Sequence, residues 1–228
     1  MKPKLTIILT VAIFFLIVAG VYVNIKKQQA VDSSKIPQKV ELSRQFQRWI
    51  TNLKNKSINV SADDFTLVEK NEIYNTRWMT VYSMDDPVKK AEYENTLKTM
   101  SGVDGVVFSP SGRELIDYRN QVRGDYLPNQ VHFYGQKEDK IIDARLLDCI
   151  SEANCYFDRA YFLDNDVFVI SEISRNFTKK DTSVPVCTID SPCTYTIKLH
   201  VINLIKNSRF VYESKPFEDV LSKLIPEL

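Results

Sequence analysis

The longest apolar stretch of the chain runs from Leu5 to Val23 (LTIILTVAIFFLIVAGVYV) and contains no charged residue. As a helix, this stretch would extend about 28 Å, close to the thickness of a bilayer core. The pattern predicts a transmembrane signal anchor over residues 1–25, inserted with its amino terminus in the cytoplasm. A cleaved signal peptide is the alternative, because Val18-Ala19-Gly20 places small residues where a signal peptidase could cut.

Residues 26–39 are polar and show no apolar periodicity, which predicts a tether between the membrane and the folded part of the chain. The pattern then becomes helical, with Phe46, Trp49 and Leu53 close to helical spacing in VELSRQFQRWITNL. We interpret this stripe as core contact at the start of an extracytoplasmic domain that spans residues 40–228.

Two segments after this helix, residues 65–73 and 77–84, are rich in β-branched and aromatic residues and predict strands. A helix is predicted next, over residues 87–100, because aspartates precede it, Pro87 suits its first turn and Gly102 follows it. The apolar side of this helix consists of Val88, Ala91, Leu97 and Met100.

The remaining chain contains a weak internal repeat of about 50 residues. GVVFSPSGRELIDYR predicts two strands joined by a turn, and VHFYGQKEDKIIDARLL predicts a hairpin. RAYFLDNDVFVISEI and YTIKLHVINLIKNSRFVYES repeat this order. Two four-stranded units predict a sheet-rich domain, either a partial propeller or a sandwich.

The carboxyl-terminal segment KPFEDVLSKLIPEL predicts a final helix that packs on the sheet. Its apolar face would consist of Phe217, Val220, Leu221, Leu224 and Ile225. With helices flanking a sheet-rich body, the predicted fold class is α+β, mostly β.

The first repeat unit carries a motif of known type. Val107 to Leu115 (VFSPSGREL) resembles the FSPDG-type blade signature of the TolB-like (PD40) β-propeller repeat, with Ser111 where that signature has aspartate. The second unit has Leu163-Asp164-Asn165-Asp166 in place of the signature. The resemblance covers roughly residues 104–215. It implies a binding or interaction platform in the cell envelope, or a domain appended to a peptidase.

The four cysteines form two pairs with the same spacing, Cys149 with Cys155 and Cys187 with Cys193. Sequence alone allows three disulfide connectivities, and we expect the nearest partners to pair. Each short ring would then contribute about 2 kcal/mol. A zinc site or free buried thiols are the alternatives, although the spacing is wider than that of usual zinc ligand pairs. Beyond a membrane anchor, disulfides are favoured.

Charge and composition exclude several functions. The formal net charge is +1, and residues 31–228 carry 26 basic and 29 acidic side chains, so a nucleic-acid partner is not expected. The chain has six glycines and no phosphate-cradling motif, which disfavours a nucleotide site. We interpret Asp164-Asn165-Asp166 as a turn rather than a calcium loop, and predict no metal and no cofactor.

Catalytic motifs are missing as well. No GxSxG or HExxH pattern occurs, and the two histidines, His132 and His200, both fall in predicted strands. A serine hydrolase would have to use one of them as the base of its triad, with a serine that no local signature nominates. The aromatic group Tyr156, Phe157, Tyr161 and Phe162 could either stack on glycans or face the core.

These observations predict a membrane-anchored extracytoplasmic binding or interaction domain. Its expected partners are the lipid bilayer, through the amino-terminal helix, and an envelope protein or glycan. The loop from Arg119 to Gln130, with Tyr126 as its candidate contact residue, and the loop from Asn176 to Cys193 occupy equivalent places in the two units. The alternative is an anchored envelope hydrolase that acts on peptide or glycan.

Overall fold

The computed structural model describes residues 34–73, 78–120, 129–149, 154–175 and 187–225, together with Gly20. Apart from Gly20, the predicted anchor therefore lies outside the described residues. Among the residues that the structure describes, none belongs to a helix long and apolar enough to cross a bilayer. Residues from Lys35 to Leu228 form one compact unit, which begins inside the segment predicted as a tether.

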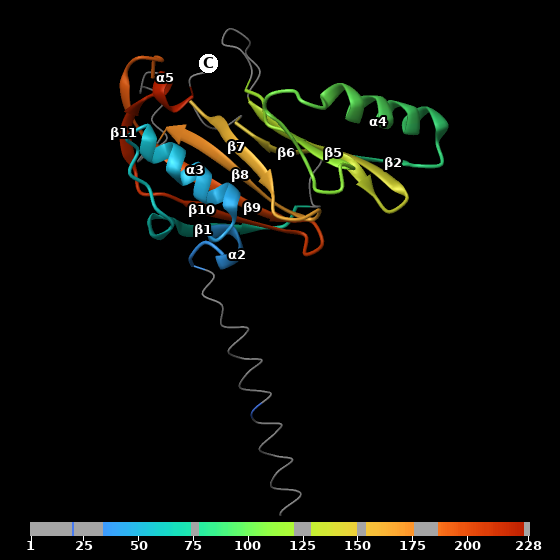
Figure 1. Ribbon diagram of the computed structural model, residues 1–228, viewed down its shortest axis with the longest axis horizontal. Coiled ribbons are helices and arrows are strands. Elements are labelled where there is room, and N and C mark those ends of the chain that lie inside the picture. The colour runs from blue at the N-terminus through green and yellow to red at the C-terminus, as the bar shows by residue number, and fades with distance from the viewer. Residues whose placement is uncertain are drawn as a thin grey trace, which may run out of the picture. The chain divides into compact units, whose positions relative to one another are not determined.

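The compact unit contains two antiparallel sheets (Figure 1). The six-stranded sheet consists of β1 (Thr66–Asn71), β10 (Ser208–Glu213), β9 (Pro192–Asn203), β8 (Val167–Arg175) and β7 (Tyr156–Phe162) in that order, with β11 (Phe217–Val220) also paired to β9. The five-stranded sheet has the order β2 (Met79–Ser83), β6 (Lys140–Asp148), β5 (Gln130–Lys137), β4 (Glu114–Asp117) and β3 (Val106–Phe108).

The predicted repeat units are two four-stranded meanders. In the first, β3 to β6 pair in chain order, and in the second β7 to β10 do the same. The preceding segment adds one outer strand to each meander, because β1 pairs with β10 and β2 pairs with β6. The described residues hold these two meanders, whereas a closed propeller ring needs roughly four or more.

Helices α2 (Gln38–Glu41) and α3 (Arg44–Asn55) cover one face of the six-stranded sheet. The Ser43 hydroxyl caps α3 by accepting from the Phe46 N–H. As predicted, Phe46, Trp49 and Leu53 are buried, and they join alternate residues of β8 and β9 in one core cluster. Burial of this stripe fixes α3 against the sheet.

A second apolar cluster lies between the two sheets. Phe133 of the five-stranded sheet and Phe168 of the six-stranded sheet stack here with ring centroids 6.0 Å apart. All four aromatic residues from Tyr156 to Phe162 are buried in one cluster or the other. The interpretation of that group as a glycan-stacking surface is therefore wrong.

Helix α4 (Pro87–Met100) begins and ends as predicted, with Asp86 accepting from the Val88 and Lys89 N–H groups. Its expected apolar side is wrong in part, since Val88 is 62% exposed and Ala91 is exposed, whereas Leu97 and Met100 are half-buried. Tyr93 is the residue that α4 buries: its ring packs on Tyr134 and its hydroxyl donates to the Arg113 carbonyl. An aromatic residue with a polar tip suits this partly polar sheet face better than aliphatic side chains do.

The carboxyl-terminal segment also differs from its prediction. Residues Phe217–Val220 form strand β11, and only Leu221–Leu224 form a helix, α5. Strand β9 extends beyond the end of β10, so β9 leaves Pro192 to Tyr195 available for pairing. Pairing with β11 satisfies the backbone hydrogen-bonding groups of this stretch. These hydrogen bonds outweigh the helical periodicity of the side chains.

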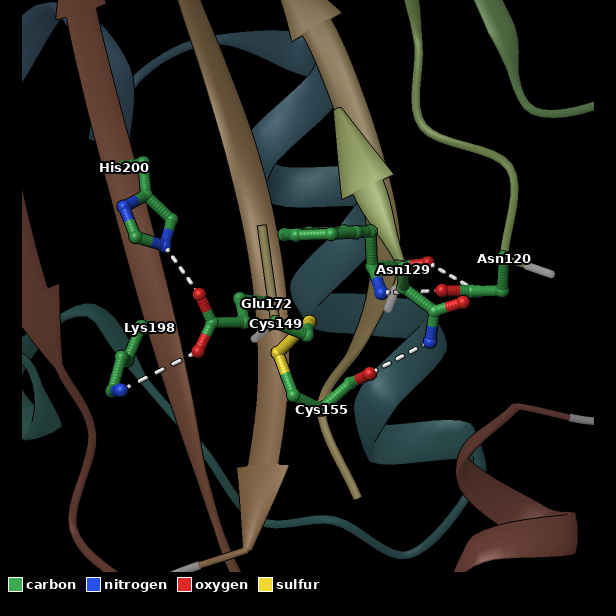
Figure 2. Close-up of a disulfide and its surroundings, with 8 residues drawn as sticks. Asn120, Asn129, Cys149, Cys155, Glu172, Lys198 and His200 are labelled. Atoms are coloured by element: carbon green, nitrogen blue, oxygen red, sulfur yellow. Dashed lines mark hydrogen bonds and ion pairs between the residues drawn. A yellow bond between two sulfur atoms is a disulfide. The ribbon is translucent and has the colours of Figure 1, made fainter. Parts of the chain in front are cut away.

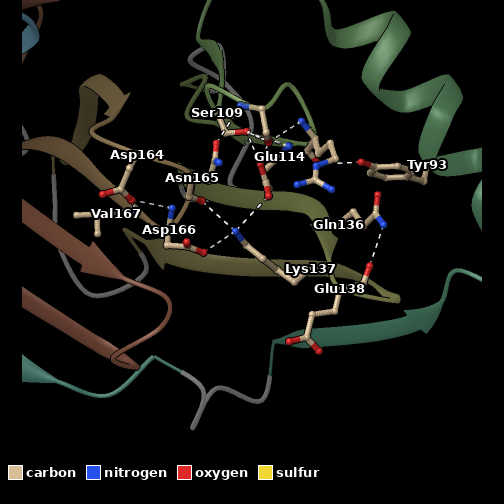
Figure 3. Close-up of polar contacts among 12 residues, drawn as sticks. Tyr93, Ser109, Glu114, Gln136, Lys137, Glu138, Asp164, Asn165, Asp166 and Val167 are labelled. Atoms are coloured by element: carbon tan, nitrogen blue, oxygen red, sulfur yellow. Dashed lines mark hydrogen bonds and ion pairs between the residues drawn. The ribbon is translucent and has the colours of Figure 1, made fainter.

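The turns of the two meanders meet in a polar cluster (Figure 3). The Glu114 side chain is 2% exposed, accepts from the Ser109 and Ser111 hydroxyls, and lies 3.1 Å from Lys137 Nζ. Lys137 Nζ also donates to the Asn165 carbonyl and to Asp166 Oδ1, at 2.9 and 2.8 Å. Lys137 therefore joins the SPSG turn of the first unit to the DND turn of the second.

Replacing Lys137 with methionine tests this junction. The change leaves the buried Glu114 carboxylate without its cation, so we expect a loss of about 2 kcal/mol in the free energy of unfolding, less than for a fully buried pair. Lys140→Met, at an exposed position of the same hairpin, should cost less than about 0.5 kcal/mol. Denaturant unfolding measures both. Equal losses in the two variants would contradict the role given to Lys137.

Candidate functional site

A groove opens where the first strands of the two meanders, β3 and β7, approach each other. It holds a cavity of about 480 Å³, and an adjoining cavity of about 290 Å³ shares three of its residues, Lys56, Asp158 and Arg159. The other residues of the larger cavity are Asp104, Gly105, Tyr118, Arg119, Asn120, Phe157 and Ile225. The groove thus draws on α3, both meanders and the residue that follows α5.

The floor of the groove is held by Asn120. Its side-chain amide donates to the Phe157 carbonyl at 2.9 Å, and its amide oxygen accepts from the Phe157 N–H at 2.8 Å. The Asn120 side chain thus binds both backbone groups of Phe157, as a neighbouring strand would, and connects the first meander to β7. Gly105, with φ of 75°, lies against Arg119, where a Cβ atom would come within 2.5 Å of Cγ. The backbone of the groove is therefore tightly defined.

The charged side chains of the groove differ in the hydrogen bonds and ion pairs that they form within the protein. Lys56 Nζ donates to the Leu224 carbonyl at 2.8 Å, Arg119 Nε donates to Asp117 at 2.9 Å, and Asp158 accepts from the Trp49 indole at 2.6 Å. Arg159 and Asp104 are exposed, and within the described part of the chain neither forms an ion pair. They offer one cation and one anion to a ligand.

Both disulfides have the expected local pairing, Cys149 with Cys155 and Cys187 with Cys193. Two asparagines tie these bridges to neighbouring backbone. Asn129 donates to the Cys155 carbonyl at 2.8 Å, and Asn154 makes both a donor and an acceptor bond with the backbone of Cys187. The described ends of the predicted binding loops are therefore fixed covalently and by hydrogen bonds. The disulfides also indicate an oxidising, extracytoplasmic compartment.

The histidines do not enter the groove. His200 is 4% exposed, and its Nε2 lies 2.9 Å from Glu172 Oε2, with Lys198 Nζ 3.4 Å from the other carboxylate oxygen (Figure 2). Burial would raise the pKa of Glu172, but the hydrogen bond from His200 and the positive charge of Lys198 lower it to about 2. This pair is a buried structural element, out of reach of a substrate.

His132 lies on the outer face of the five-stranded sheet, and its Nε2 is 3.0 Å from Gln130 Oε1. It shares a shallow cavity with Asp143, which the groove does not include. Tyr126 lies outside the described residues and stays a prediction. The structure brings Arg119, the first residue of the predicted binding loop, into the groove. The described residues hold no group of three or more His, Cys, Asp or Glu side chains able to bind a metal ion.

Sequence reasoning missed Lys56 and Arg159, whereas Asn120 falls inside the predicted binding loop from Arg119 to Gln130. No local motif marks Lys56 or Arg159, because Lys56 directly follows α3, Arg159 lies in β7, and the two meet only in the folded unit. No protein-family model, curated protein or solved structure matches the chain. Function is therefore inferred from these residues alone.

The Glu172 pair predicts the acid sensitivity of the unit. A carboxyl group whose pKa falls on folding stabilises fully above its ordinary pKa, here 4.5, and this contribution is lost as the pH falls through about 2. Glu172→Gln removes this titrating group. Between these two pH values, its free energy of unfolding should therefore fall by on the order of a few kcal/mol less than that of the parent protein. Glu218→Gln, at an exposed position, should leave the slope unchanged. Unfolding curves at several pH values would contradict this prediction if both variants kept the slope of the parent protein.

Proposed function

We propose that this protein is an extracytoplasmic recognition domain, held at the membrane by residues 5–23, that captures an extended polar segment of an envelope protein in the groove between its meanders. The observation that carries the proposal is the combination of a rigid floor with an open, polar wall. Asn120 clamps the floor, while Arg159 and Asp104 remain exposed beside the cavity.

The chemistry of the lining favours a polypeptide of mixed charge. Arg159 would bind a carboxylate of the partner, and Asp104 would bind a basic side chain or a backbone N–H group. Cavities of about 480 and 290 Å³ that share residues can accommodate several residues in extended form. Loops on a rigid scaffold are common binding sites, and here disulfides anchor two loop ends.

The blade-like arrangement fits the same proposal. Two meanders whose first strands lie at the groove would correspond to neighbouring blades of a TolB-like propeller, and the resemblance implies an interaction platform. This kinship stays a proposal, supported by the SPSG turn and by the four-stranded order of each unit.

Cross-linking in intact cells tests the groove. A benzophenone residue in place of Arg159 should form an adduct with an envelope protein on irradiation, whereas the same residue in place of Arg48, exposed on α3, should not. Arg159→Glu should lower co-purification of that partner at least tenfold, because it repels the carboxylate. Its melting temperature should stay within about 1 to 2 °C of the parent protein. Equal adducts at both positions would contradict the proposal.

Fractionation tests the membrane placement. The protein should sediment with membranes and resist carbonate extraction, because an uncharged apolar helix is retained in the bilayer. Protease added from the outer side should digest the chain beyond residue 30. A soluble mature form that begins near Val21 would instead establish a cleaved signal peptide.

A further inference from the structure

The outer face of the five-stranded sheet is only partly covered. Helix α4 packs over Tyr134 through Tyr93, and beyond this contact the face opens into a depression of about 310 Å³. The depression is lined by Trp78, Thr80, Gln130, His132, Asp143 and Arg145. This volume is at the lower end of the range for small-ligand sites, roughly 300 to 1,000 Å³.

Trp78 is the aromatic residue of the depression. Its side chain is 55% exposed, although tryptophan is usually well covered in folded proteins. The guanidinium carbon of Arg145 lies 3.8 Å from the centre of the Trp78 ring system, and the Arg145 backbone N–H donates to the Trp78 carbonyl at 3.0 Å. Arg145 therefore covers one indole face, while Trp78 as a whole keeps 55% of its surface exposed.

The charged groups at the depression carry no positive excess. Arg145 Nε lies 3.6 Å from the Asp148 carboxylate, and Asp143 also lines the depression. Arg145 Nε and Nη2 are buried and make no hydrogen bond. A site with two carboxylates beside one guanidinium has no excess positive charge to attract an anion. An acidic ligand is therefore disfavoured.

The remaining lining groups are polar and of mixed hydrogen-bonding type. His132 and Gln130 lie side by side on β5, with Nε2 and Oε1 3.0 Å apart. Thr80 and Asp143 are register partners on β2 and β6. Together they supply hydroxyl, amide, imidazole and carboxylate groups. Sugar hydroxyls, which both donate and accept, match such a set.

We propose that this depression is a binding site for a neutral saccharide. The apolar face of a sugar ring would stack on the exposed surface of Trp78, and its hydroxyls would bond to His132, Gln130, Thr80 and Asp143. A peptide with a hydrophobic anchor fits less well, because Trp78 is the large apolar side chain of the lining. The site is separate from the groove, so this inference does not rest on the proposed protein partner.

The two tryptophans allow a direct measurement. Trp49 is 2% exposed and Trp78 is 55% exposed, so acrylamide quenches mainly Trp78 fluorescence. The intact protein would be titrated with cellotetraose, chitotetraose, maltotetraose and mannotetraose, each to 10 mM. At least one should protect Trp78 from acrylamide and shift its emission to shorter wavelength. Sodium chloride at 0.5 M should leave this binding unchanged within twofold, since no charge is neutralised.

Variants locate the site. Trp78→Ala should weaken saccharide binding, followed by calorimetry, at least tenfold, and Trp78→Phe should recover part of it because a ring is restored. Val81→Ala is the matched control: this side chain is 44% exposed on the same strand, but its register partner Ile142 faces the inter-sheet core. It should bind within twofold of the parent protein.

Several outcomes would overturn the inference. The first is that none of the four saccharides protects Trp78 from acrylamide. The second is that Trp78→Ala and Val81→Ala weaken saccharide binding equally. The third is that the protein prefers an acidic polysaccharide and that salt abolishes this binding. A peptide ligand that displaces the saccharide probes from Trp78 at lower concentration would do the same. Cleavage of a saccharide, lost in a folded His132→Ala variant, would replace the binding site with a hydrolase site.

Discussion

The central strands of the six-stranded sheet bury apolar side chains on both faces, and the arrangement of the whole unit follows from this constraint. Along β8, Val169 and Ile173 face α3, while Phe168 and Ile170 face the second sheet. Exposing either apolar face to water would raise the free energy of the folded state. A helical layer therefore covers one face, and a second sheet covers the other. The five-stranded sheet supplies that cover with its inner face alone. Its outer face is left free to carry α4 and the depression at Trp78.

Much of this organisation can be predicted from local patterns. Strand alternation and short polar turns indicate both meanders, and the spacing of Phe46, Trp49 and Leu53 indicates α3. Predictions failed where a neighbour distant in sequence decides the outcome. Val88 and Ala91 of α4 are exposed because Tyr134 and the Arg113 carbonyl favour burial of Tyr93. The carboxyl-terminal segment forms a strand because β9 extends beyond the end of β10 and pairs there with β11.

The candidate sites were predictable only in outline. Twin cysteine spacing indicates the two bridges, and the loop that begins at Arg119 leads to the groove. Local sequence patterns do not indicate that Arg159 lies beside Lys56 or that Trp78 stacks with Arg145. Each pair joins elements whose approach is set by the packing of the sheets. The burial of His200 against Glu172 is of the same kind.

The pairing of β1 with β10 determines when the chain can complete its fold. Thr66, in the first strand, is opposite Glu213, near the end of the chain. As the chain is made from its amino terminus, β1 therefore waits until β10 has followed, with its backbone edge unpaired. Such long-range pairing slows folding, and an unpaired edge promotes association with other chains. Exposed charged residues on β1, among them Glu69 and Lys70, oppose such association while the partner is absent.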